Sequence, residues 1–480
     1  MAATLITVAA MASRIINREK DRWRLKAMRR AINAATFMIR WPKIANIECK
    51  PIPSPMNRPF FILALLVFGL SRPAKTQQPD FVYSPVIRTP QLFMAGNQLG
   101  YPILRLNSSD QLELHFDDID GDTKSYYYTF QLCNADWTPA IVSEFDYIKG
   151  FSQVRIGNYQ LSSVALTRYT HYQAVLPDPN CIPIHSGNFL LKVFLDGDTS
   201  KLAFTRRFLV TDAKATIQSQ LLQPLDYQIA RTHQRLQFRV NTNAVNPNNP
   251  LDQIKVVVLQ NYRWDNAVKG LKPTFYSNNN LEYNNDNDIV FEGGMEWRWL
   301  DLQSFRYQSD RIQSVNYGKT STEVIARPDA ERSRQDYYFY KDYNGNFFIT
   351  TTESINPLWQ TDYANVLFSF VPPGNSAYPN KDVYVLGKFT GGAINDSSLM
   401  TFNPDRGRYE RRFMLKQGYY SYCYATVGKG DPDAKPSFAL TEGSHVETEN
   451  DYTILVYYRA LGARADELVG IARFNSLNTR

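Results

Sequence analysis

Residues 111–117 read "QLELHFD", and this short stretch indicates the class of the fold. Its apolar residues Leu112, Leu114 and Phe116 alternate with polar ones, so the two kinds of side chain fall on opposite faces of an extended chain. A repeat of two residues is typical of a β-strand with one buried face. The stretch therefore predicts a half-buried strand.

Further segments rich in aromatic and β-branched residues follow along the chain, and each predicts another strand. These segments are 125–133, 189–198, 234–242, 254–260, 365–370, 381–389, 418–427 and 452–458. The dipeptides Asp120-Gly121, Asp196-Gly197 and Asn344-Gly345 are turn signals, and the last of them predicts a hairpin between "YYFYKDY" and "NFFITTT". Short helices are expected only at 161–170 and 467–472. The predicted class is all-β.

Changes in composition predict three β-domains after residue 78. We expect a first domain at 79–212, a second at 213–375 and a third at 376–480. The boundary at 375 rests on the linker "VPPGNSAYPNKD", where three prolines and a glycine crowd into a stretch that cannot easily sit inside a sheet. Domains of this size and strand content are typical of immunoglobulin-like or early-Ig-type β-sandwiches in tandem.

An unbroken apolar run of eleven residues occupies 60–70. It is too short for a membrane-spanning helix, which needs about 20 apolar residues. With Arg58 before it and small residues after it, the run is typical of a secretory signal peptide, here 56–78. We therefore expect translation to start at Met56, with residues 1–55 as a spurious upstream extension. The alternative for 1–55 is an Arg-rich organelle presequence.

The net charge depends on this interpretation. The whole chain has a formal charge of +7, but residues 1–55 hold eleven basic and three acidic residues, and the signal region holds three more basic ones. Residues 77–480 keep 39 basic and 43 acidic residues, a net charge of −4. They contain no basic run of the kind that binds nucleic acid, so we expect no nucleic-acid partner.

Three cysteines remain after the signal region: Cys133, Cys181 and Cys423. They allow at most one disulfide, and the spacing between Cys133 and Cys181 matches no zinc motif. Either all three are buried thiols, or Cys133 and Cys181 form a disulfide.

Motifs for catalysis or metal binding are weak throughout the chain. "FDDIDGD" at 116–122 resembles the start of a calcium loop, but its glycine falls too early and the required glutamate is absent, so we interpret it as a solvated turn. "YGKT" at 317–320 lacks the first glycine of a phosphate loop. The histidines do not fall at metal-ligand spacing, and His171 fits a structural role better than that of a catalytic base. We expect no enzyme activity, no cofactor and no metal.

Several long phrases in the first predicted domain resemble a known family. They are "LNSSDQLELHFDDIDGDTKSYYYTFQLCNADWTPAIVSEFDYIKGF" from Leu106, "YTHYQAVLPD" from Tyr169, "SGNFLLKVF" from Ser186 and "TRRFLV" from Thr205. They are similar to the N-terminal domain of type IX secretion system plug proteins, formerly a domain of unknown function in Bacteroidota. The resemblance extends over the mature chain and is densest from 80 to 212. Leu132 departs from it, at a position where the family has histidine.

The resemblance implies an exported periplasmic protein at the inner face of the outer membrane. Such a protein docks on the periplasmic mouth of the type IX translocon barrel and occludes the pore while no cargo passes. The implied partner is this barrel, with no small-molecule substrate, and the chain is peripheral to the membrane through its partner.

Three tryptophans are candidates for contact with that partner. Trp264, Trp297 and Trp299 flank the polar stretch "NNNLEYNNDND", which predicts loops, and exposed aromatic side chains of this kind anchor interfaces. The alternative is that they fill the core of the second domain.

A binding module of another class is the alternative function. The predicted third domain, 376–480, resembles early-Ig-type modules that include carbohydrate-binding domains. Those modules stack sugars on paired tryptophans, whereas this chain has no tryptophan after Trp359. A carbohydrate-binding or cell-surface binding module without catalysis is therefore the second hypothesis, and a hydrolase ranks below it.

Overall fold

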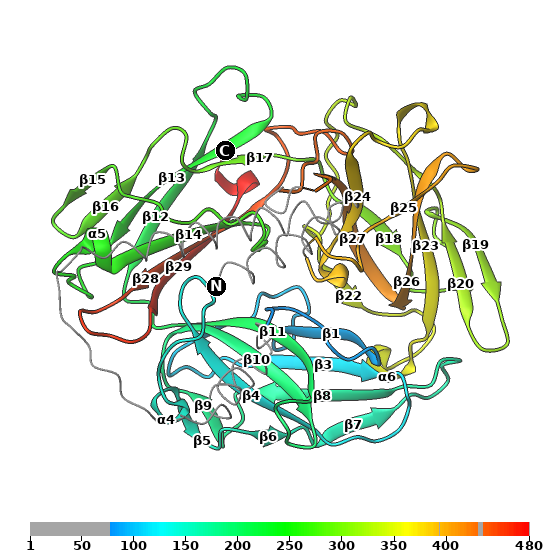
Figure 1. Ribbon diagram of the computed structural model, residues 1–480, viewed down its shortest axis with the longest axis horizontal. Helices are drawn as coiled ribbons and strands as arrows, with labels where there is room; N and C mark the ends of the chain where they lie inside the picture. The colour runs from blue at the N-terminus through cyan, green and yellow to red at the C-terminus, as the bar shows by residue number, and fades with distance from the viewer. Residues whose placement is uncertain (1–76, 393, 431–434, 480) are drawn as a thin grey trace, which may run out of the picture. The chain divides into compact units, whose positions relative to one another are not determined.

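The structure is a computed structural model that describes residues 77–392, 394–430 and 435–479. The predicted upstream extension 1–55 and residues 56–76 of the predicted signal peptide lie outside the described residues. Residues 77–480 form one compact unit, built of β-sheets that pack face to face in three sandwiches (Figure 1).

The first sandwich pairs a four-stranded sheet, in the order β1-β3-β8-β7, with a five-stranded sheet, in the order β2-β11-β10-β4-β6. Its strands are β1 (Ile87–Met94), β2 (Ile103–Arg105), β3 (Leu112–Asp118), β4 (Tyr126–Cys133), β6 (Val154–Arg155), β7 (Asn158–Leu161), β8 (Thr170–Leu176), β10 (Gly187–Leu195) and β11 (Leu202–Thr211). The short helix α4 (Glu144–Tyr147) leads into a small separate pair, β5 (Ile148–Gly150) with β9 (Cys181–Pro183). In β3 the apolar residues Leu112, Leu114 and Phe116 are fully buried as expected. The prediction of a half-buried strand is wrong, because His115 and Asp117 on the opposite face are buried as well.

The middle sandwich pairs the sheet β12-β13-β16-β15, with β17 beside β13, and the three-stranded sheet β14-β28-β29. Its elements are β12 (Thr216–Leu222), β13 (His233–Asn241), α5 (Pro250–Gln253), β14 (Ile254–Gln260), β15 (Phe275–Ser277), β16 (Asn280–Tyr283), β17 (Val290–Glu292), β28 (Asp451–Tyr458), β29 (Glu467–Asn475) and the 3₁₀ turn η4 (Ser476–Thr479). Its core includes side chains from both ends of this range, such as Val256 and Ile454.

The third sandwich pairs the sheet β18-β27-β22, with β24 beside β27, and the sheet β19-β20-β23-β26-β25, with β21 beside β23. Its elements are β18 (Arg298–Asp301), β19 (Ile312–Tyr317), β20 (Thr322–Ala326), β21 (Asp329–Ala330), β22 (Phe347–Ile349), α6 (Pro357–Gln360), β23 (Tyr363–Val371), η2 (Pro373–Asn375), β24 (Lys381–Leu386), η3 (Lys388–Thr390), β25 (Thr401–Asn403), β26 (Arg408–Lys416) and β27 (Gly418–Gly428). Its core is rich in aromatic rings, among them Phe368, Tyr420 and Tyr422. The prediction of an all-β fold of tandem sandwiches is confirmed.

Strand pairing assigns the residues of the second half of the chain to sandwiches in a way that differs from the predicted domain boundary at 375. β23 pairs with β26 across that boundary, so residues on both sides of it share one sheet. β14 pairs with β28 near the C-terminus, which places the whole third sandwich between two parts of the middle one. We therefore propose a division into 79–212, then 213–295 with 444–480, and an inserted third sandwich at 296–443. The proline-rich stretch that predicted a linker is a connection inside the third sandwich, between β23 and β24.

Two predicted helices are wrong. Residues 467–472 lie in strand β29, where they pair with β28, and residues 161–170 join β7 to β8 without a helix. "ELVGIA" is too short for the spacing of its apolar residues to tell a strand from a helix. Its pairing with β28 decides its conformation.

The Asn344-Gly345 turn has the expected backbone, with φ of 50° and 76° at the two residues. The predicted hairpin is wrong: the strand after the turn forms as β22 and pairs with β27, whereas residues 337–343 before the turn are a loop. A Cβ atom on Gly345 would lie 2.6 Å from the ring of Trp297, so the turn folds closely over this tryptophan.

Substitution of Gly345 should therefore be costly. We expect Gly345→Ala to lower the free energy of unfolding by about 2 to 4 kcal/mol, from the left-handed backbone together with overpacking against Trp297. Gly270→Ala is the matched control, since Gly270 has a φ of 72° and a Cβ atom added there would meet no other atom within 4 Å. It should cost about 1 kcal/mol. Urea denaturation of both variants tests this, and equal losses would contradict a role for the Trp297 contact.

Candidate functional site

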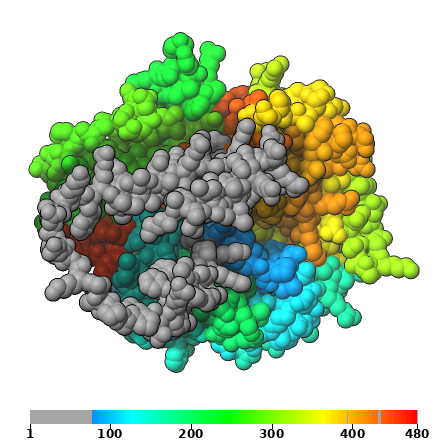
Figure 2. Space-filling view, in the orientation of Figure 1, coloured from blue at the N-terminus to red at the C-terminus, as the bar shows by residue number. Residues whose placement is uncertain are grey.

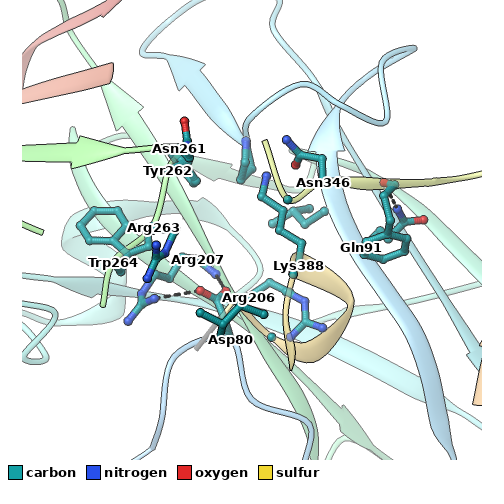
Figure 3. A pocket seen from close by; sticks show the side chains of 18 of the residues that line it. Asp80, Gln91, Arg206, Arg207, Asn261, Tyr262, Arg263, Trp264, Asn346 and Lys388 are labelled. Atoms are coloured by element: carbon teal, nitrogen blue, oxygen red, sulfur yellow. Dashed lines mark hydrogen bonds and ion pairs between the residues drawn. The ribbon is translucent and has the colours of Figure 1, made fainter. Parts of the chain in front are cut away.

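A cavity of about 360 Å³ lies where the three sandwiches meet (Figure 3). Each sandwich contributes side chains to its wall, and we call it the interdomain pocket. The residues that line it include Asp80, Gln91, Arg206 and Arg207 of the first sandwich, Asn261, Tyr262, Arg263, Trp264 and Asp265 of the middle one, and Trp297, Asn344, Asn346, Phe347 and Lys388 of the third. Pockets of this size are typical of small-molecule sites, with an apolar lining and a few polar groups.

The structure brings two of the three predicted tryptophans together at this pocket. Trp264 and Trp297 line it, whereas Trp299 lies outside it and stacks on Tyr419. Trp297 is only 6% exposed, so for this residue the structure favours packing over the proposed contact role. Trp264 is half-buried and packs edge-on against Trp137 at 4.9 Å. A contact role for Trp264 and Trp299 stays a prediction.

Positive charge dominates the pocket wall. Two arginines have carboxylate partners there: Arg207 binds Asp80 at 2.9 Å, and Arg263 binds Asp265 at 3.1 Å. Arg206 instead donates to backbone carbonyls, two bonds of 2.9 and 3.1 Å to the carbonyl of Pro90 and one of 2.8 Å to that of Thr205. Arg206 and Arg207 are consecutive residues in the middle of β11, and both line the pocket (Figure 3).

Lys388 is the fourth cationic group of the wall. It begins the short turn η3 and its side chain extends along the cavity in the direction of Tyr262 (Figure 3). Its ammonium nitrogen lies 4.5 Å from the ring centre of Tyr101 and 5.6 Å from that of Tyr262. Burial lowers the pKa of Lys388 to about 7, despite the opposing charge of Asp80. No hydrogen bond or ion pair of this ammonium group occurs within the described part of the chain.

A buried polar network joins the first sandwich to the third. The Asp117 carboxylate of β3 accepts from His171 of β8 at 2.6 Å and from Lys416 and Tyr363 of the third sandwich. His115 lies 3.1 Å from the other nitrogen of His171. All five side chains are at most 5% exposed. In the space-filling view the blue residues of the first sandwich lie directly against the yellow and orange residues of the third (Figure 2).

This network has the histidine and carboxylate of a catalytic group but lies in a closed interface. Burial together with the neighbouring His171 ring lowers the pKa of His115 to about 4, so this ring is neutral at pH 7. Burial raises the pKa of Asp117. The charge of Lys416 and the hydrogen bond from His171 lower this pKa by more than burial raises it, so the carboxylate is ionised at pH 7. The arrangement supports the structural role predicted for His171. It fixes one sandwich to another through charged groups that water does not reach.

Two acidic groups have the spacing of a metal site. Asp118, Asp120 and Asp122 of the "FDDIDGD" turn gather around the Lys124 ammonium nitrogen, which lies 2.8 Å from Asp118 and 3.3 Å from Asp122. A lysine thus supplies the positive charge in this turn.

The second acidic group consists of Glu296, Asp342 and Glu449, whose carboxylates lie within 4.8 Å of one another. Burial raises the pKa of Asp342 well above its usual value and raises that of Glu449 as well. Asn344 donates to Glu449 at 2.9 Å. Protonation of some of these groups lowers their mutual repulsion.

The three cysteines are free and buried in the structure. Cys133 and Cys181 do not form the disulfide that the sequence allowed. Burial raises the pKa of both thiols to about 12, which keeps them protonated and unreactive at pH 7.

Exposed apolar side chains gather around α4 and the β5–β9 pair. Ile141 is 84% exposed, Phe145 80%, Phe151 67% and Ile184 44%. The chain segments that carry them touch, because Ile184 donates its backbone N–H to the carbonyl of Tyr147, and Phe151 donates to that of Asn180. We call these four residues the α4 patch. Grouped apolar exposure of this kind is typical of interaction surfaces.

Sequence reasoning found some of these features and missed others. It singled out Trp264 and Trp297 but not Arg206 or Lys388, because lysines and arginines are common on every strand and their convergence depends on how the sandwiches meet. The exposed pair Phe145 and Phe151 had a sequence signal, since both are apolar residues in a polar stretch, "SEFDYIKGF".

Comparisons with known proteins agree with this architecture. Residues 87–212 match the family model described as Type 9 secretion system plug protein 1st domain. The matched range runs from the start of β1 to just past the end of β11, which is the first sandwich. The crystal structure of a hypothetical protein from Parabacteroides merdae ATCC 43184, at 2.30 Å resolution, is similar over 83% of this chain and 100% of its own, with 29% sequence identity and a TM-score of 0.79. No curated protein matches the chain.

The fold and the site define an all-β protein of three joined sandwiches with a pocket at their junction. Its first sandwich matches the first domain of type 9 secretion system plug proteins, so the resemblance found in the sequence is confirmed. This family is not a known enzyme family. The helices of the described segments are all too short or too polar to cross a membrane.

Proposed function

We propose that this protein is an exported periplasmic plug of the type IX secretion system. It docks on the periplasmic mouth of the outer-membrane translocon barrel and occludes its pore while no cargo passes. The observation that carries this proposal is the family match of the whole first sandwich, residues 87–212.

The structure supports a role in blocking a pore. A protein that blocks a wide pore must be rigid. The three sandwiches are held together by buried contacts, which make the assembly rigid. The first and middle sandwiches share an apolar junction that includes Leu209, Tyr262 and Tyr457, while the first and third share the Asp117–Lys416 network. Such buried contacts resist relative motion of the sandwiches.

The α4 patch is the surface that we propose for docking. All four of its residues fall within the range that matches the plug family. It carries two exposed phenylalanines, and large aromatic side chains dominate the energy of protein interfaces. The proposal therefore places the translocon contact on the outer end of the first sandwich.

Deletion of the gene should make the outer membrane leaky to large hydrophilic solutes, because an open translocon barrel is wide. The leak should require the barrel, since a plug acts only through its bound state. Uptake of a large hydrophilic dye or antibiotic measures it. A strain that lacks both the plug and the barrel is the control, and it should be as tight as the wild type. Equal leakiness of the single and double deletions would overturn the proposal.

A further inference from the structure

The charges of the interdomain pocket do not balance. Its wall holds four cationic side chains and two carboxylates, and those carboxylates are engaged by Arg207 and Arg263. Arg206 donates its hydrogen bonds to backbone carbonyls, and the Lys388 ammonium group lies against aromatic rings. Both side chains are half-buried. A partly desolvated charge without a counter-charge is costly, and an anion in the cavity would lower that cost.

The remainder of the wall indicates what kind of anion fits. Tyr262, Trp264, Trp297 and Phe347 provide apolar and aromatic surface, and the cavity of about 360 Å³ is in the size range of small-molecule sites. Arg206 is a second cation without a carboxylate partner, but all three of its nitrogens already donate to backbone carbonyls. The Lys388 ammonium group beside aromatic rings therefore suits a singly charged carboxylate on an apolar body. A phosphate ester carries up to two charges and a large hydration shell. An organic carboxylate therefore fits the wall better than a phosphate.

We propose that the interdomain pocket binds a small organic carboxylate with an aromatic or aliphatic body, and that its carboxylate pairs with the Lys388 ammonium group. This inference goes beyond the plug function and does not depend on it. Because all three sandwiches line the pocket, a bound ligand would contact each of them and stabilise their assembly.

The proposal gives binding a distinct pH dependence. Burial lowers the pKa of Lys388 to about 7. The charged groups that act on it are Asp80 before β1, Asp451 of β28 and Arg473 of β29. The carboxylate stays ionised above pH 6, but Lys388 must be protonated to pair with it. Affinity should be highest below pH 7 and should fall by about tenfold per pH unit above it.

The test uses the purified full chain with 4-phenylbutyrate as the probe and 4-phenylbutyramide as its neutral analogue. Isothermal titration calorimetry should show saturable binding of the carboxylate at pH 6.5 and at least tenfold weaker binding of the amide. Thermal unfolding should shift upward with the carboxylate alone. Lys388→Met should weaken carboxylate binding at least tenfold and remove its pH dependence.

Lys319→Met is the matched control, because Lys319 is an exposed lysine in the β19–β20 turn of the same sandwich. It should bind the probe like the wild type. If Lys388→Met fails to fold, the pH dependence of the wild type decides instead. Equal binding of the acid and the amide, full affinity in Lys388→Met, constant affinity from pH 6 to 9, or no saturable binding at millimolar probe would each overturn the proposal. The leak experiment is unaffected by any of these results.

Discussion

Lys416→Met is expected to lower the free energy of unfolding by about 3 to 5 kcal/mol, because it leaves the Asp117 carboxylate buried without its main counter-charge. Lys416 and Asp117 are each 1% exposed and come from different sandwiches. Methionine has a similar length and fills the space of the lysine stem. The loss of unfolding free energy therefore measures mainly the removal of the charge and only to a small extent a change in packing. Urea denaturation followed by tryptophan fluorescence measures it.

An exposed ion pair in the same sandwich provides the control. Lys429 pairs with Asp382 at 3.5 Å, and its side chain is 57% exposed. Lys429→Met should cost at most about 1 kcal/mol, since solvent screens such pairs. The two variants should also differ in their pH dependence. The pKa of Asp117 is lowered in the folded protein, so its contribution is present at neutral pH and is lost as the pH falls below about 4. Equal losses of unfolding free energy in both variants at pH 7 would contradict a stabilising role of the buried Asp117–Lys416 pair.

Individual strands could be predicted well from the sequence because a strand needs only local information. Residues 254–260, predicted from their β-branched run, are β14 to the residue, and 418–427 falls within β27. The alternation of buried and exposed side chains depends on the chain's own period of two, so it is visible without knowledge of the partner strand.

Strand partners could not be predicted in this way. β14 ends at Gln260, and its partner β28 begins at Asp451. Nothing in the sequence of either strand identifies the other, because both are near-continuous β-branched and aromatic runs that are buried along most of their length. The insertion of the third sandwich into the middle one follows from this single pairing. The proline-rich stretch near residue 375 indicates a break in the sheet correctly, but a break between strands and a break between domains have the same composition.

The pocket and the buried network lie at junctions between sandwiches, which explains why the sequence did not reveal them. Asp117 and Lys416 are ordinary charged residues on ordinary strands, and their pairing exists only once the first and third sandwiches meet. The polar stretch before Trp297 predicts a contact role for this residue. The structure buries it under the Asn344-Gly345 turn, whose geometry could be predicted but whose position over the tryptophan could not.

Replacing both phenylalanines of the α4 patch should release the protein from the translocon. If the plug docks through this patch, Phe145→Asp with Phe151→Asp should weaken binding to the detergent-solubilised barrel by about 2 to 4 kcal/mol, which is a loss of roughly 30-fold to 1,000-fold in affinity. The two side chains are 80% and 67% exposed, so the isolated protein should keep its thermal unfolding midpoint. Co-purification with the barrel and biolayer interferometry measure the loss.

An exposed aromatic residue on another sandwich separates this effect from a general loss of surface hydrophobicity. Tyr307 is 83% exposed and lies between β18 and β19 in the third sandwich. Tyr307→Asp matches the Phe145→Asp half of the double replacement in exposure and in the charge it adds, and it should leave barrel binding unchanged. If both sets of variants bind the barrel like the wild type, docking uses another surface, and Trp264 and Trp299 become the next residues to replace. If Tyr307→Asp alone weakens binding, the contact lies on the third sandwich. Only a selective loss in the phenylalanine variant, with the fold intact, supports the first sandwich as the part that meets the pore.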